Sequence, residues 1–160
     1  MIRAHMKHEH SPQGRIYLDL DGVIYPIAQA PENDPDIEQL HAYEWWRKSV
    51  VDRLGKLGAE IVLASSWGEA FMKSKIRSPE LHSIRALNEK AIARDSKITV
   101  IQQDLELHPV EQVVWIDDAI NDDAMQQLRK SANEPLVIIP EKSVGLTLDD
   151  LVTIDAYLRK

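Results

Sequence analysis

The chain has 160 residues, of which 19 are basic and 26 acidic, giving a net charge of −7. This length suits one domain, and a hydrophobic fraction of 44% is too high for a disordered chain. Because the chain has no cysteine, disulfides, thiolate zinc sites and cysteine nucleophiles are excluded, and we expect a cytoplasmic protein. No apolar run is long enough for a membrane helix, and the acidic balance argues against a general nucleic-acid coat.

Residues 1–14 are polar and contain His5, His8 and His10. Histidines at this spacing can bind a metal ion, but composition favours a flexible arm that takes no part in the fold. We therefore expect a single domain over residues 15–160. Residues 16–20 predict a short strand that ends at a turn, and three prolines within residues 25–36 predict a loop.

The next segments alternate between helical and strand patterns. An apolar stripe predicts a helix over residues 37–57, which ends at Gly58. Residues 61–64 predict a strand buried on both faces. Helices are predicted for residues 69–76 and 79–94, whereas residues 96–105 fit either a helix capped by Ser96 or a strand.

The last third of the chain repeats this alternation. Strands are predicted over residues 113–116 and 136–139, and helices over 122–132 and 147–158, the last with Thr147 as its cap. Strands that alternate with helices predict an α/β domain with a doubly wound, Rossmann-like and mainly parallel sheet flanked by helices. In such sheets the polar site lies at the carboxyl ends of the strands.

Three of the four predicted strands end in polar side chains. The first is followed by Asp19 and Asp21, the second by Ser65 and Ser66, and the third by Asp117 and Asp118. Each pattern alone is common in turns and helix caps. Together they predict one crevice full of carboxylates, which a cation must neutralise, and oxygen ligands of this kind suit Mg²⁺ together with a phosphate group.

These motifs resemble those of the haloacid dehalogenase-like (HAD) superfamily of phosphohydrolases. Residues 17–23, which read YLDLDGV, resemble its first motif, residues 61–65 its second, and residues 115–122 its fourth. The resemblance covers nearly all of the chain after the arm. The strings around Trp67, Trp115 and Gly145 also resemble the HAD domain of Swiss Army Knife RNA repair proteins.

The resemblance implies roles for individual residues. Asp19 is the expected nucleophile and Asp21 the expected acid and base. The resemblance places Mg²⁺ on Asp19, the backbone carbonyl of Asp21 and Asp118, with supporting roles for Asp117 and Asp122. It assigns Ser65, helped by backbone N–H groups near Ser66 and Gly22, to the phosphoryl oxygens.

The family also uses a lysine or arginine between the second and fourth motifs. Lys97 is favoured because it begins a helix-like stretch shortly before the third strand, with Lys90 second and Lys73 and Lys75 as further candidates. An ordinary surface role for Lys97 stays open.

The sequence leaves no room for a cap domain. Residues 22–45 are too few and too rich in proline, so an open site is expected, with residues 25–35 as a partial lid. Such a site accepts large phosphorylated substrates, including a polynucleotide end, although the charge offers no support for nucleic acid. Trp67 fits either core packing or stacking on a base or sugar.

Three hypotheses follow from these residues. The first is a Mg²⁺-dependent phosphatase that forms an aspartyl-phosphate. The second is a signalling receiver domain, which motif order disfavours, because receivers carry their acidic pair after the first strand. The third is a non-catalytic interaction module that retains the fold, which the presence of both Asp19 and Asp21 disfavours.

Overall fold

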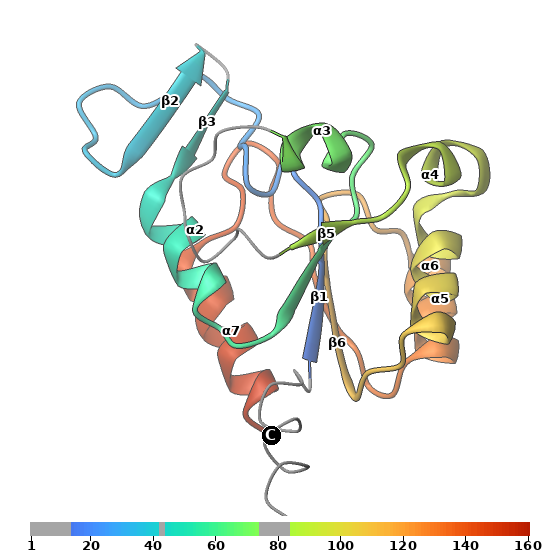
Figure 1. Cartoon of the computed structure of the whole chain (residues 1–160). Helices are drawn as coiled ribbons and strands as arrows, with labels where there is room; N and C mark the ends of the chain where they lie inside the picture. Colours follow the sequence, from blue (N-terminus) through green and yellow to red (C-terminus); the bar gives the residue numbers. More distant parts are fainter. Residues whose placement is uncertain (1–13, 42–43, 74–83) are drawn as a thin grey trace, which may run out of the picture.

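The computed structural model describes residues 14–41, 44–73 and 84–160, and its centre is a parallel sheet (Figure 1). The sheet has five strands in the order β5-β4-β1-β6-β7. They are β1 (Gly14–Leu18), β4 (Glu60–Leu63), β5 (Arg85–Ala86), β6 (Gln112–Ile116) and β7 (Leu136–Ile138). The chain builds outward from β1 to β5, then continues with β6 on the other side of β1. This reversal puts a topological switch point at the carboxyl end of β1 and confirms the predicted doubly wound fold.

Helices cover both faces of the sheet (Figure 1). On one face lie α2 (Lys48–Gly55) and α7 (Leu148–Leu158), and on the other lie α4 (Glu89–Asp95), α5 (Lys97–Leu107) and α6 (Asp122–Ser131). Strand β1 supplies both cores by alternation: Ile16 and Leu18 belong to the α2/α7 side, and Tyr17 to the α5/α6 side. Asp19 continues this alternation on the α5 side.

The expected helix over residues 37–57 is wrong in its first half. Strands β2 (Ile37–His41) and β3 (Glu44–Arg47) pair as an antiparallel hairpin, and α2 begins only at Lys48. The start of α2 is fixed from a distance, because the Asp36 carboxylate accepts hydrogen bonds from the backbone N–H of Ser49 at 2.9 Å and from its hydroxyl at 2.6 Å. The spacing of apolar residues within the helix cannot indicate a cap that is supplied from 13 residues earlier in the chain.

Of the helix predicted over residues 79–94, the structure confirms residues 89–94, and the prediction is wrong for the described residues before them. Residues Arg85–Ala86 form the edge strand β5, and helix α4 covers only Glu89–Asp95. A strand of two residues is too short to show any periodicity, so the sequence predicted four strands where the sheet has five. Helix α3 (Gly68–Met72) is shorter than expected, and residues 74–76 lie outside the described residues.

Elsewhere the expectations are confirmed or completed. The ambiguous segment after Ser96 is helix α5, and the Ser96 hydroxyl accepts the Thr99 N–H. Thr147 caps α7 within a reciprocal capping box. Gly14 is the first residue of β1, whereas the arm was expected to include it; the rest of the arm, with its three histidines, lies outside the described residues. Within the described part, no helix is both long and apolar enough to cross a bilayer.

Candidate active site

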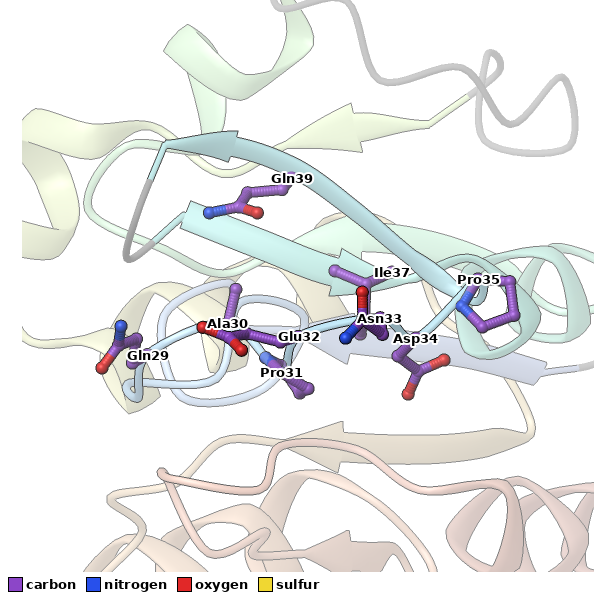
Figure 2. Close-up of a pocket in the computed structure, with 9 residues that line it drawn as sticks. All are labelled: Gln29, Ala30, Pro31, Glu32, Asn33, Asp34, Pro35, Ile37 and Gln39. Atoms are coloured by element: carbon purple, nitrogen blue, oxygen red, sulfur yellow. The ribbon is translucent and has the colours of Figure 1, made fainter.

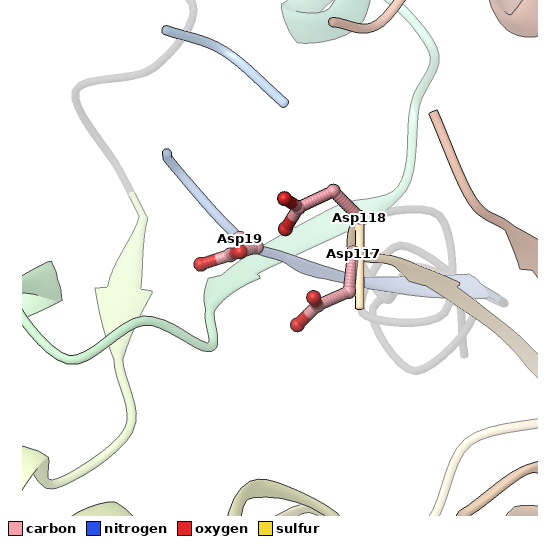
Figure 3. Close-up of side chains that lie close together, drawn as sticks. All are labelled: Asp19, Asp117 and Asp118. Carbon is pink, nitrogen blue, oxygen red and sulfur yellow. The ribbon is translucent and has the colours of Figure 1, made fainter. Parts of the chain in front are cut away.

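Three aspartates lie side by side at the carboxyl ends of β1 and β6 (Figure 3). Asp19, Asp117 and Asp118 each offer a carboxylate oxygen, and these oxygens all lie within 4.8 Å of one another. Strand register explains the meeting: Leu18 is level with Ile116, so the residues that follow both strands emerge at the same edge of the sheet. A backbone hydrogen bond of 3.0 Å from the Asp19 N–H to the Ile116 carbonyl extends the pairing by one step.

Lys97 is the cation of this cluster. Its ammonium lies 2.6 Å from Asp117 Oδ2 and 3.3 Å from Asp19 Oδ1. Lys97 is the first residue of α5, whose N-terminal end therefore lies beside the end of β1. The second oxygen of Asp117 accepts the Ala119 N–H at 3.0 Å, so Asp117 is held on both sides.

The cluster shifts the protonation of its own groups. Burial raises the pKa of Asp19, the charge of Lys97 opposes this, Asp117 adds to it, and the result is a pKa of about 7. Burial would lower the pKa of Lys97, but the charges of Asp19 and Asp117 outweigh it and the pKa is raised. Lys97 therefore stays an ammonium, while Asp19 changes charge near neutral pH.

The residues fit a divalent cation. Among the described residues, three carboxylates meet one ammonium, which leaves uncompensated negative charge, and the carboxylate oxygens are ligands of the kind that Mg²⁺ prefers. Gly22 contributes to the site because it has no side chain. It adopts a φ of +78°, and a Cβ there would lie 2.5 Å from Asp118 Oδ2, so any other residue would displace this carboxylate.

Asp21 lies outside the three-carboxylate cluster. Its side chain is exposed, and its Oδ2 accepts a hydrogen bond of 3.0 Å from the indole N–H of Trp67. The Trp67 ring also packs against Tyr25 and Phe71, with centroid distances of 5.4 and 6.0 Å. Trp67 is therefore partly core, as expected, but it also positions Asp21, which the sequence did not indicate.

The expected phosphate-binding residues lie at the neighbouring strand end. Ser65 follows β4, is buried, and its hydroxyl accepts the Trp67 backbone N–H at 3.3 Å. Ser66 is exposed. Because β4 pairs directly with β1, Ser65 emerges at the same edge of the sheet as Asp19.

The remaining candidates that the structure describes are not part of the cluster. Lys90 and Lys73 are exposed on α4 and after α3, and Lys75 lies outside the described residues. Asp122 is exposed in the first turn of α6 and is not one of the three clustered aspartates.

Two cavities open near the hairpin. The larger, of about 730 Å³, lies between the loop over residues 29–35 and strand β2 (Figure 2), and none of the clustered aspartates lines it. The smaller, of about 600 Å³, is lined by Asp21, Tyr25, Pro26, Ile27, Ala28, Glu44 and Trp67. Through Asp21, this second cavity adjoins the candidate active site, and we call it the Trp67 pocket.

A doubly wound sheet, an acidic cluster at its switch point and a lysine between two of the aspartates define a HAD-like domain. Residues 15–151 match the family described as the HAD domain in Swiss Army Knife RNA repair proteins. The chain belongs to this family, and its fold is that of HAD-type hydrolases. Comparison with curated proteins and with solved structures gave no match.

Proposed function

We propose that the protein is a Mg²⁺-dependent phosphomonoester phosphatase that works through an aspartyl-phosphate. The observation that carries this proposal is the position of the Lys97 ammonium between Asp19 and Asp117, with Asp118 in the same cluster. A carboxylate beside a fixed cation, at the edge of a sheet where ligands bind, is suited to attack a phosphoryl group.

Asp19 would attack phosphorus through one carboxylate oxygen. The bond from phosphorus to the ester oxygen breaks, and Asp21 gives that oxygen a proton. Water then attacks the phosphorus of the aspartyl-phosphate and passes its proton to Asp21, while the bond to Asp19 breaks and inorganic phosphate leaves. The indole of Trp67 holds the Asp21 carboxylate through both steps.

Mg²⁺ would be held by the side chains of Asp19 and Asp118 and by the backbone carbonyl of Asp21, and it would offset negative charge on the phosphoryl group. Lys97 would bridge Asp19 and a phosphoryl oxygen, and the buried Ser65 hydroxyl would donate to another. Asp117, held by Lys97 and the Ala119 N–H, would keep the ammonium in place.

The test replaces the proposed nucleophile while preserving its shape. Asp19→Asn should reduce phosphatase turnover by roughly a thousandfold or more, because the amide cannot form the acyl phosphate. Turnover is measured as phosphate release in Mg²⁺, with the folded state checked by circular dichroism. The control is Glu32→Gln, which removes an exposed charge from the wall of the larger cavity, and this variant should remain active. Full activity in the Asp19→Asn variant would end the proposal.

A further inference from the structure

The Trp67 pocket shares Asp21 with the candidate active site. Asp21 lines the pocket, and under the proposed function it is also the residue that protonates the leaving oxygen. The group attached to that oxygen must therefore leave from beside Asp21, where a cavity of about 600 Å³ is large enough for a small ligand. The inference that follows rests on the proposed function, because it assumes that Asp21 meets the leaving group.

The wall of this pocket is mainly apolar. Of the described residues that line it, five are apolar or aromatic: Tyr25, Pro26, Ile27, Ala28 and Trp67. The Ile27 residue is 55% exposed, and the half-buried ring of Trp67 is held by contacts with the rings of Tyr25 and Phe71. The pocket therefore offers a flat ring and a large aliphatic side chain, and a ligand that covers them removes apolar surface from water.

The polar backbone groups along this wall are already engaged within the protein. The N–H and the carbonyl of Tyr25 form hydrogen bonds of 2.9 and 2.8 Å inside their own turn. The Ile27 N–H donates to the Lys142 carbonyl at 2.7 Å, and the proline before Ile27 has no N–H. The Ala28 carbonyl accepts the indole N–H of Trp45 at 2.8 Å. Burial of apolar surface, rather than new hydrogen bonds to these groups, is therefore the main gain on binding.

The polar side chains of the wall are engaged as well. The indole N–H of Trp67 donates to Asp21, and Asp21 must hold a proton when it meets the ester, so it carries no charge at that stage. Glu44 is exposed and has an interaction of its own, so it is not a free acceptor. Burial, followed by the two nearby carboxylates, raises the pKa of the Tyr25 hydroxyl, which stays neutral. Such a wall suits an uncharged hydrocarbon group better than a hydroxylated or ionic one.

From this wall we infer that the Trp67 pocket binds an apolar leaving group, so that the preferred substrates are phosphomonoesters of alcohols with a ring or branched hydrocarbon beside the ester oxygen. The phosphate lies at Asp19, the leaving oxygen at Asp21, and the hydrocarbon group against Trp67 and Ile27. The bond from phosphorus to the oxygen breaks, and the alcohol leaves with the proton from Asp21. An ester with hydroxyl or charged groups in the same place gives up their hydration without a matching gain.

The experiment compares kcat/KM for benzyl phosphate, ethyl phosphate and glycerol 3-phosphate in the presence of Mg²⁺. In all three the leaving oxygen is bound to an aliphatic carbon, so the esters differ mainly in the group that they place in the pocket. Benzyl phosphate should exceed glycerol 3-phosphate by roughly ten- to a hundredfold, the factor expected for burial of one aromatic side group. Ethyl phosphate should lie between them. An ester of ethanol or glycerol that matches benzyl phosphate overturns the inference.

Variants at Ile27 test the pocket without removing the hydrogen bond between Trp67 and Asp21. Ile27→Asp places a carboxylate on the apolar wall and should lower the ratio of benzyl phosphate to glycerol 3-phosphate by roughly tenfold, whereas Ile27→Leu should preserve the ratio. Leu107→Asp is the matched control, because Leu107 is also an exposed aliphatic residue but ends α5, the helix that Lys97 begins. A ratio that Ile27→Asp leaves unchanged overturns the inference.

Variants at Trp67 separate the pocket from the positioning of Asp21. Trp67→Phe loses the hydrogen bond to Asp21 but keeps a ring, so it should lower kcat for all three esters and preserve most of their ratio. Trp67→Ala loses both the bond and the ring, and the ratio of benzyl phosphate to glycerol 3-phosphate should approach one. A ratio that ignores Trp67→Ala contradicts the pocket.

Failure of the proposed function gives a different result. In that case none of the three esters is hydrolysed, and the pocket is tested with benzyl alcohol, which carries no phosphate. The indole N–H signal of Trp67, identified among the four tryptophans by its loss in Trp67→Phe, is followed by NMR. A saturable shift that Ile27→Asp weakens supports the apolar site even without turnover. No shift with benzyl alcohol, or an equal shift with glycerol, overturns it.

Discussion

Helix α5 carries two charged side chains to two different environments along strand β1. Lys97 and Asp104 are seven residues apart and so lie on one face of the helix, just as Asp19 and Tyr17 lie on one face of the strand. At the carboxyl end of β1, Lys97 meets an excess of carboxylates. Two turns further along the helix, Asp104 enters a network whose charges balance.

The balanced network joins Arg15, Arg85, Glu60, Asp104 and the hydroxyl of Tyr17. Arg85 binds Asp104 through two hydrogen bonds of 2.7 and 3.0 Å, and Arg15 and Arg85 share Glu60. The Tyr17 hydroxyl donates to Asp104 at 2.5 Å. With two guanidinium groups for two carboxylates, this network satisfies its own charges and has no need of a ligand.

The two regions shift carboxylate pKa values in opposite directions. Burial acts to raise the pKa of Asp104, but hydrogen bonds from Arg85 and Tyr17 outweigh it and the pKa is lowered. In the acidic cluster burial prevails, and the pKa of Asp19 rises to about 7. The balanced network therefore stabilises the fold, whereas the cluster retains charge for a ligand at some cost in stability.

Removing Asp104 should have the largest effect on stability. Asp104→Ala leaves the buried guanidinium of Arg15 with one carboxylate fewer, and loss of one partner from a buried pair costs on the order of 3–5 kcal/mol. The free energy of unfolding in urea measures this cost. Asp95→Ala removes a half-buried carboxylate that pairs only with its exposed neighbour Arg94 in the described structure, and should change far less. Equal losses for both variants would contradict the stabilising role of the network.

Lys97→Met should have the next largest effect on stability. The free energy of unfolding should fall by about 2 kcal/mol at pH 8 in the presence of a chelator. The variant removes the ammonium from Asp19 and Asp117. Asp19 can respond by taking up a proton, so the loss should be smaller at pH 5, and added Mg²⁺ should recover part of it. Lys90→Met on the exposed face of α4 is the matched control. A loss that is independent of both pH and Mg²⁺ would show that Lys97 only packs.

Much of this arrangement follows from the sequence, and the rest does not. Asp19, Asp118 and Lys97 could be predicted because each follows a strand or begins a helix, and parallel strands bring their ends together. The hairpin of β2 and β3 could not be predicted, because Asp36 fixes the start of α2 from outside the helix. The hydrogen bond from Trp67 to Asp21 depends on a side-chain contact between distant elements, and so does the network around Asp104. Local spacing does not encode such contacts. A charged Arg15 within a buried strand was the one available signal for the network.

Asp19→Asn should stabilise the metal-free protein at pH 8, because the amide carries no charge in this buried cluster. In the unfolded chain Asp19 titrates near its ordinary pKa of 3.8, and in the folded protein near 7. Between these values the folded state binds more protons, so the stability contributed by protonated Asp19 is lost as pH rises toward 7. The amide avoids this loss, and its advantage should be small at pH 4 and full above pH 7. Thermal unfolding in a chelator across this range measures it, and a gain that is constant with pH would refute the assignment.

The smallest effect expected is that of Mg²⁺ on the intact protein. Binding to the folded state alone raises the free energy of unfolding by about 1.4 kcal/mol at ten times the dissociation constant. Because protons and Mg²⁺ compete for Asp19, the rise should be larger at pH 8 than at pH 5.5. Asp118→Asn should weaken it, since this variant removes a carboxylate charge from the cluster but leaves both contacts of Lys97 in place. Asp104→Asn changes the balanced network instead, so that variant, though less stable, should gain as much from Mg²⁺ as the unaltered chain. Should both variants respond equally, the excess charge at the end of β1 would not be what attracts the ion.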